Sequence, residues 1–197
     1  MTPEAESVLE LFRSTNAYLQ GHFRLTSGLH SAEYLQSALV LQHPAAAERL
    51  GRLMAQEMLP LLTTRPETVV SPALGGLIIG HEVARALGCR LLFTERDPES
   101  RKMVLRRGFS VKPGENTVVV EDVITTGGST QDVIEHLTGA GAKVLAAGSI
   151  IDRSGGHANV GVPRVALVTL QVAAHYPEDC PMCRLGLPVV KPGSRPT

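Results

Sequence analysis

Between residues 68 and 170, short apolar segments alternate with segments of helical character, and this alternation is the strongest constraint on the fold. The strand-like segments are 68–76, 89–95, 116–122, 143–153 and 164–170. Helical patterns follow at 77–88 and 129–142, each with glycine at its C-terminal end. Strands that are apolar throughout are buried on both faces, as in parallel sheets. The pattern predicts an α/β fold: a parallel sheet with helices on both faces.

The residues before this region have a different spacing of apolar residues. Residues 4–20 predict an amphipathic helix that places Val8, Leu11, Phe12 and Leu19 on one side. Residues 21–42 alternate turn residues with short apolar pieces, which indicates a compact strand-and-turn unit. A second helix is predicted to begin at Pro44, because Leu50, Leu53, Met54, Met58 and Leu61 then recur at helical spacing.

The composition excludes several classes of protein. A chain of 197 residues suits one domain with a small appendage. Lys plus Arg number 19, as do Asp plus Glu, so we expect neither a nucleic-acid partner nor a membrane partner. The start, "MTPEAESVLE", lacks the layout of a signal peptide. Three cysteines in this context favour a reducing compartment, and we expect the protein to be cytoplasmic.

The segment "VVVEDVITTGGST", residues 118–130, carries the clearest chemical signal. Glu121 and Asp122 end a strand, and ligands of parallel sheets bind at the carboxyl ends of strands. The residues 125–129 can turn successive backbone N–H groups toward a phosphate. Ser129 or Thr130 can cap the following helix, with Asp132 in its first turn.

The two carboxylates indicate what accompanies the phosphate. They would repel it, so they need sugar hydroxyls or a magnesium ion as partners. The segment has neither the lysine of a P-loop nor the spacing of a dinucleotide-binding loop. A ribose 5-phosphate fits this arrangement. The competing interpretation is a buried strand with solvated charges and a Gly-rich turn.

This segment resembles the signature of type I phosphoribosyltransferases, which binds phosphoribosyl pyrophosphate (PRPP). The resemblance implies the fold of that family, Mg²⁺ held through the substrate near Glu121 and Asp122, and a catalytic role for both acids. It also implies that PRPP contacts Glu121, Asp122, Val123, Ile124, Thr125, Thr126, Gly127, Gly128 and Ser129.

Three further segments resemble the orotate phosphoribosyltransferases within that family. Residues 21–36 resemble the substrate hood, 71–88 the pyrophosphate loop, and 149–156 the strand end whose arginine contacts orotate. The resemblance covers about residues 5–175. It places PRPP at Ala73, Leu74 and Gly75, and orotate at Thr125, Arg153, Tyr34 and Leu35.

Arg153 has the right chemistry for orotate, because a guanidinium pairs with a carboxylate in a fork. The competing interpretation is a surface ion pair between Asp152 and Arg153. The resemblance also implies three parts of the chain: an N-terminal helix and small hood at 1–42, a phosphoribosyltransferase core at 43–175, and a tail at 176–197.

The resemblance implies a mobile catalytic loop between Glu95 and Gly114, and we expect the basic segment at 96–107 to form it. We expect Arg96 to bind PRPP, and Arg101 and Lys102 to be catalytic. The resemblance implies a homodimer whose loop reaches into the neighbouring site. The chain departs from many relatives, which have lysine at the positions of Thr26 and Gly75 and a histidine in the loop. The alternative for this segment is a solvated polar hairpin.

The implied reaction transfers the phosphoribosyl group of PRPP to orotate, giving orotidine 5′-phosphate and pyrophosphate, a step in pyrimidine biosynthesis. The alternatives are a phosphoribosyltransferase for another nucleobase and a regulator that senses PRPP without catalysis.

The tail contains Cys180 and Cys183 as C-x-x-C, which is half of a zinc site. His175 can add a ligand, or two chains can share one ion. Cys89 is distant in sequence. A redox role and no special chemistry are the other interpretations.

Overall fold

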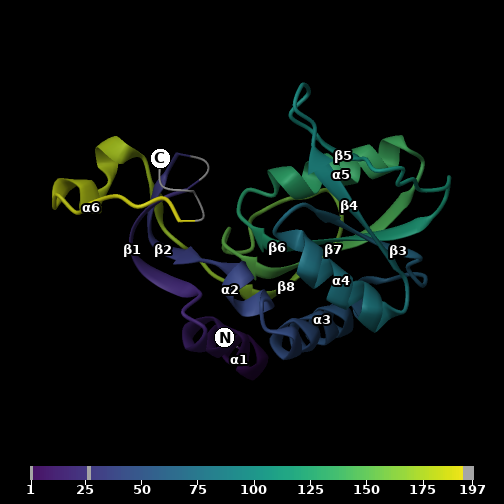
Figure 1. The fold of residues 1–197 in the computed structure, drawn as a ribbon, viewed down its shortest axis with the longest axis horizontal. Helices are drawn as coiled ribbons and strands as arrows, with labels where there is room; N and C mark the ends of the chain where they lie inside the picture. Colours follow the sequence, from purple (N-terminus) through teal and green to yellow (C-terminus); the bar gives the residue numbers. More distant parts are fainter. Residues whose placement is uncertain (1, 26–27, 193–197) are drawn as a thin grey trace.

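The computed structural model describes residues 2–25 and 28–192 (Figure 1). The predicted departure at Thr26 lies outside the described residues. The helices are α1 (Pro3–Ser14), α2 (Ser37–Leu41), α3 (Pro44–Met58), α4 (Gly76–Leu87), α5 (Gly128–Gly139) and α6 (Pro181–Arg184), with short 3₁₀ turns at Leu59–Leu61 and Pro177–Asp179. The strands are β1 (Tyr18–Arg24), β2 (His30–Leu35), β3 (Thr68–Pro72), β4 (Arg90–Arg96), β5 (Met103–Leu105), β6 (Asn116–Ile124), β7 (Lys143–Asp152), β8 (Arg164–Thr169) and β9 (Ala174–His175).

The central sheet has six strands in the order β5-β4-β3-β6-β7-β8. All neighbours are parallel except β5, which pairs antiparallel with β4. The predicted α/β class with a parallel sheet is therefore confirmed. The basic segment contains a strand that was not predicted, β5, in which Met103 is buried in an apolar cluster.

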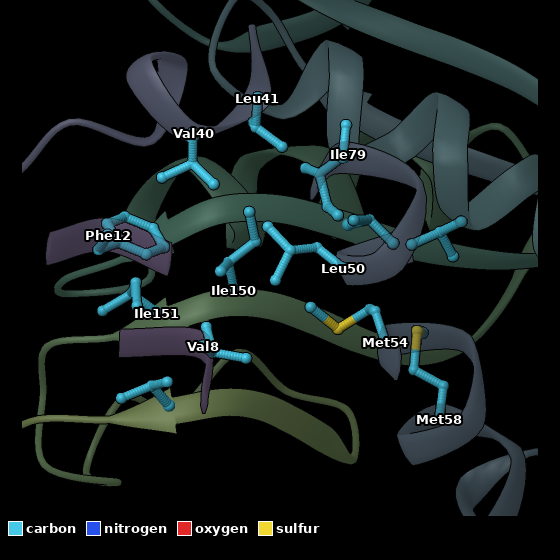
Figure 2. Packing of buried hydrophobic residues seen from close by; sticks show 14 of the residues in the cluster. Val8, Phe12, Val40, Leu41, Leu50, Met54, Met58, Ile79, Ile150 and Ile151 are labelled. Atoms are coloured by element: carbon cyan, nitrogen blue, oxygen red, sulfur yellow. The ribbon is translucent and has the colours of Figure 1, made fainter. Parts of the chain in front are cut away.

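Helices cover both faces of this sheet, as Figure 1 shows. Successive strand residues point to opposite faces, and Val118 and Val120 pack in one apolar cluster while Val119 packs in the other. The first cluster, drawn in Figure 2, includes residues of α1, α3 and α4. The second includes residues of α5. This double burial explains why β6 reads as an uninterrupted apolar run.

The first helix is shorter than predicted. It ends at Ser14, and Leu19 lies in β1 instead of continuing the helical face. Asn16 has φ 53°, a left-handed conformation that ends the helix, and the Ala17 N–H donates to the Phe12 carbonyl. The start of α3 at Pro44 and the end of α4 at Gly88, which has φ 66°, agree with the prediction.

A second sheet forms the hood, defined here as β1, β2 and β9 in the order β1-β2-β9. It lies beside the central sheet in Figure 1, together with α6. The segment after α6 extends the edge of β1: the Arg24 N–H donates to the Val190 carbonyl, and the Val190 N–H donates to the His22 carbonyl, both at 2.8 Å. Residues from both ends of the described chain therefore build the hood.

Helix α1 packs against the central sheet. Its residues Val8 and Phe12 belong to the first apolar cluster, which also contains Leu50 of α3 and Leu35 of β2 (Figure 2). None of the described helices is both long enough and apolar enough to cross a membrane.

Candidate active site

Glu121 and Asp122 lie near the carboxyl end of β6, which runs between β3 and β7 in the middle of the sheet. They face in opposite directions, as consecutive strand residues do. Glu121 is 9% exposed and accepts a hydrogen bond of 3.1 Å from the Thr130 hydroxyl of α5. Asp122 faces the other way, toward Gly75 in the turn between β3 and α4: a Cβ on Gly75 would be 2.6 Å from Asp122 Oδ1. A glycine therefore allows this close approach.

Burial raises the pKa of both carboxyl groups. For Glu121 burial is the main cause, the negative charge of Asp122 adds to it, and the pKa rises to about 8. Burial is also the main cause for Asp122, whose pKa is raised. In the ligand-free protein at neutral pH, Glu121 therefore holds a proton, and the pair presents less negative charge to an anionic ligand than two ionised acids would.

We expect Glu121→Gln to reduce the loss of stability that occurs as the pH rises from about 5 to 8. Between the ordinary pKa and about 8, the folded protein keeps the Glu121 proton while the unfolded chain releases it. The free energy of unfolding then falls as pH rises, by at most about 1.4 kcal/mol per pH unit, and levels off above pH 8. Glutamine removes this contribution, so the variant should gain stability relative to wild type between pH 5 and 8.

Urea unfolding at several pH values measures this difference. Glu10→Gln is the matched control, because the side chain of Glu10 is 67% exposed on α1. Equal pH slopes for wild type and Glu121→Gln would show that Glu121 does not titrate with the raised pKa.

The loop after β6 leads directly into the N-terminus of α5. Gly127 precedes the helix with φ 86°, and no side chain caps the helix. The predicted cap by Ser129 or Thr130 is therefore wrong: the helix begins one residue earlier, and Thr130 bonds to Glu121 instead. Helix N-termini without a capping side chain retain unsatisfied N–H groups, which favour an anion.

The basic segment lies against the first turns of α5. Arg96 Nη2 donates to Ser129 Oγ at 3.2 Å, and Arg96 Nη1 is 3.5 Å from Asp132 Oδ2. Lys102 Nζ is 3.1 Å from Asp132 Oδ1 and 3.2 Å from Glu135 Oε2. Asp132 thus forms ion pairs with both Arg96 and Lys102. It lies beyond the first turn of α5, in which it was predicted to be. Arg101 adopts a left-handed conformation, φ 60°, next to Lys102.

Arg153 follows β7 directly and reaches toward the hood. Its Nη2 donates to Ser31 Oγ at 3.3 Å and to the Glu33 carbonyl at 3.4 Å. Its buried Nε has no hydrogen-bond partner in the described part of the chain. Burial lowers the pKa of the guanidinium. An unpartnered buried donor on a cation is costly, and it suits an anionic ligand.

The interpretation of Asp152 and Arg153 as an ion pair is wrong. Asp152 is fully buried and pairs with Arg164, whose Nη1 is 2.8 Å from Asp152 Oδ2. Asp152 Oδ1 also accepts a hydrogen bond of 2.6 Å from the Ser154 hydroxyl. Arg153 is therefore left for other partners.

A cleft of about 750 Å³ lies between the hood and the carboxyl ends of the strands. The predicted site residues that line it are Tyr34, Leu35, Arg96, Asp122, Val123, Thr125, Thr126, Gly128, Ser129 and Arg153. The lining also contains residues that were not predicted to bind a ligand: Leu25, Leu29 and Gln36 of the predicted hood segment, Asp132, Val172 and Ala174. Val172 and Ala174 are apolar residues outside any motif, so no sequence signal could have identified these two.

The other predicted site residues lie outside this lining. Glu121, Ile124 and Gly127 are buried beneath it, and Ala73, Leu74 and Gly75 form the turn between β3 and α4, with Leu74 83% exposed. Arg101 and Lys102 are exposed in the basic segment. Cys180 and Cys183 lie in the tail, beside His22 and His30 of the hood, and His175 is not part of this group.

The sequence of this chain matches a known protein family. Residues 37–175 match the phosphoribosyl transferase domain family, which is more than half of the chain. The sheet, the hood and the cleft beside the β6–α5 loop are those of a type I phosphoribosyltransferase.

Sequence identity to curated relatives identifies the subgroup within this family. The chain is 50% identical to an orotate phosphoribosyltransferase from Heliobacterium modesticaldum, over 96% of this chain and 98% of that protein. It is 51% identical to one from Pelotomaculum thermopropionicum, over 96% and 97%. The chain belongs to the orotate phosphoribosyltransferase family.

Solved structures show that the fold alone does not identify the base that the enzyme uses. The structure of orotate phosphoribosyltransferase from Aeropyrum pernix is 27% identical, with a TM-score of 0.68, and the match covers 83% of this chain and 94% of that one. An adenine phosphoribosyltransferase is 17% identical with a TM-score of 0.63, covering 83% and 99%. The fold is thus shared by enzymes named for different bases, so base choice depends on local residues.

Proposed function

We propose that this protein transfers the phosphoribosyl group of PRPP to orotate, producing orotidine 5′-phosphate and pyrophosphate for pyrimidine biosynthesis. The observation that carries the proposal is Arg153, a half-buried cation that lines the cleft and whose buried Nε has no hydrogen-bond partner among the described residues. Orotate is a pyrimidine with a carboxylate, and it supplies the missing acceptor. The identity of about half the residues with orotate phosphoribosyltransferases supports this choice of base.

PRPP fits the residues along the β6–α5 loop. The 5′-phosphate would occupy the uncapped N-terminus of α5, where N–H groups and the helix dipole favour an anion. Asp122, on the cleft wall, would accept hydrogen bonds from the ribose hydroxyls. Arg96, also on the wall, would contact a phosphate. Orotate would lie between Arg153 and the hood, against Tyr34 and Leu35.

The proposed reaction joins a ring nitrogen of orotate to C1 of the ribose while pyrophosphate departs. The sugar then has oxocarbenium character, as in glycoside chemistry. The negative charge of Asp122 would stabilise that positive character, and the hood and basic segment would exclude water. Glu121 lies behind the cleft and would orient the site through Thr130, with its proton retained.

The residues present also fit the Mg²⁺ ion expected with PRPP. Magnesium in proteins is commonly held by one or two carboxylates together with substrate phosphates. Asp122 offers one carboxylate toward the cleft, and Thr125 and Ser129 offer hydroxyls nearby. When bound, Mg²⁺ neutralises and orients the pyrophosphate leaving group.

An assay of pyrophosphate release from PRPP and Mg²⁺ tests the function. Orotate should support release and yield orotidine 5′-phosphate, whereas uracil, adenine, guanine and xanthine should not. Release with one of the other bases alone would reassign the substrate. PRPP binding without release for any base would instead identify a sensor of PRPP.

We also propose a homodimer in which the basic segment of one chain enters the site of its partner. In the present structure Lys102 pairs with Asp132 and Glu135 of its own chain. Exposed ion pairs of this kind contribute little stability, so an anionic substrate can replace them.

Mixing inactive variants tests this arrangement. A chain with Arg101→Ala and Lys102→Ala is combined with an Asp122→Asn chain. Action across the interface leaves one intact site in each mixed dimer, and roughly a quarter of the wild-type activity should return. Mixed dimers that form but remain inactive would show that the segment acts within its own chain.

A further inference from the structure

Four metal-binding side chains meet in the hood, away from the cleft. His22 comes from β1 and His30 from β2, while Cys180 directly precedes α6 and Cys183 lies within it. Their potential ligand atoms all lie within 4.8 Å of one another. His22, His30 and Cys180 are buried, with exposed fractions of 5%, 6% and 0%. Both cysteines are free thiols.

The separations between these atoms resemble those around a tetrahedral zinc ion. With Zn–N near 2.0 Å and Zn–S near 2.3 Å, a nitrogen and a sulfur ligand lie about 3.5 Å apart. The observed nitrogen–sulfur distances are 3.5 Å for Cys180 to His22, 3.7 Å for Cys183 to His22 and 3.3 Å for Cys183 to His30. The two ring nitrogens are 2.8 Å apart, and a shift of roughly half an ångström would bring them to the separation expected in such a shell.

The orientation of His22 favours metal binding. Its Nδ1 lies 2.8 Å from the Leu187 carbonyl, to which it donates as an N–H group. This hydrogen bond leaves Nε2 as the nitrogen with a free lone pair, and Nε2 is the atom that faces His30 and both sulfurs. Histidine ligands of zinc are usually fixed in this way by a carbonyl or carboxylate behind the ring.

The local structure of the cysteines fits as well. Cys180 precedes α6 and Cys183 lies within it, at the two-residue spacing of structural zinc sites. The Arg184 N–H donates to the Cys180 carbonyl, and Gly186, with φ 67°, turns the chain back so that Leu187 reaches His22. The tail thus supplies two thiols and the carbonyl that orients a histidine.

We propose that His22, His30, Cys180 and Cys183 bind one structural zinc ion that fastens the tail to the hood. Four protein ligands fill a tetrahedral shell, so no position remains for water or substrate, which distinguishes the site from a catalytic one. The ion would join β1 and β2 to a segment far away in the sequence: His22 and Cys180 are 158 positions apart, and His30 and Cys183 are 153 apart. This inference does not depend on the proposed reaction.

Metal analysis of the purified full-length chain is the first test. We expect about one zinc per chain in the wild type. Cys183→Ser should lose it, and this variant is suitable because Cys183 is exposed, so that its side chain is not part of the core. Cys89→Ser is the matched control, since it removes a cysteine outside the group, and it should retain the ion. Zinc absent from the wild type, or equally present in both variants, would overturn the proposal.

Cobalt substitution tests the ligand set itself. Co²⁺ bound by two thiolates and two imidazoles in a tetrahedron should give intense visible absorption and a thiolate charge-transfer band. His30→Ala should weaken both, whereas His175→Ala should not, because His175 lies outside the group. An octahedral spectrum, or a disulfide between Cys180 and Cys183 in protein purified without oxidant, would reject the site.

The stability readout is independent of enzymatic activity. Chelation should lower the unfolding temperature of wild type and Cys89→Ser, because binding to the folded state stabilises it. Chelation should leave Cys183→Ser unchanged. A chelator effect that persists in Cys183→Ser would mean that the metal binds elsewhere.

Discussion

Asp122→Asn should lower the turnover of PRPP and orotate by about two to three orders of magnitude, the cost typical of losing one preorganised electrostatic group. Asparagine keeps the shape of the side chain but removes the charge beside the ribose. Because Asp122 lines the cleft and is close to Gly75, the isosteric change should leave the fold intact. Steady-state kcat, with circular dichroism as the check on folding, measures the effect.

The control for that prediction is Glu10→Gln, which also removes one carboxylate but on the exposed surface of α1. Its kcat should equal that of the wild type. If Asp122→Asn also retained full turnover, the carboxylate would have no part in stabilising the transition state, and the proposed role of Asp122 would be withdrawn.

Arg153→Ala should raise the KM for orotate roughly tenfold to more than a hundredfold, as expected for loss of a charge-assisted hydrogen bond worth about 1.5–3 kcal/mol. The KM for PRPP should hardly change, because the guanidinium contacts the hood through Ser31 and Glu33 and not the β6–α5 loop. Initial rates with each substrate varied in turn separate the two constants.

Two further variants sharpen the test of Arg153. Arg153→Lys keeps a charge but loses the planar fork, so it should recover only part of the affinity for orotate. Arg49→Ala, which removes an exposed arginine that bonds to Ser7 on α1, should change neither constant. If Arg153→Ala raised both KM values equally, the assignment of this arginine to the orotate site would be wrong.

The central sheet was predictable because β6 and its neighbours are buried on both faces, which leaves a continuous apolar run in the sequence. The end of α1 was not predictable from the sequence. Leu19 continues the helical spacing of apolar residues, although the left-handed conformation of Asn16 has already ended the helix. Periodicity records which residues are apolar, whereas helix ends depend on backbone conformations that asparagine adopts only in some contexts.

In the site, the order of the acids, threonines and glycines identified the β6–α5 loop. The sequence did not reveal that Glu121 bonds to Thr130, because that contact depends on where α5 packs. The two histidines beside Cys180 could also not be predicted from the sequence. His22 and His30 have no metal-binding spacing relative to the cysteines, and only the return of the chain to the hood brings them together.

The return of the chain also affects the order in which the protein can fold during synthesis. At about 5–20 residues per second, the ribosome needs roughly 8–30 seconds to proceed from His22 to Cys180. During that interval β1 lacks the segment around Val190 that later pairs with its edge. An unpaired strand edge is a site for association with other chains. The hood should therefore be the last part of a nascent chain to become protected, after the central sheet has formed.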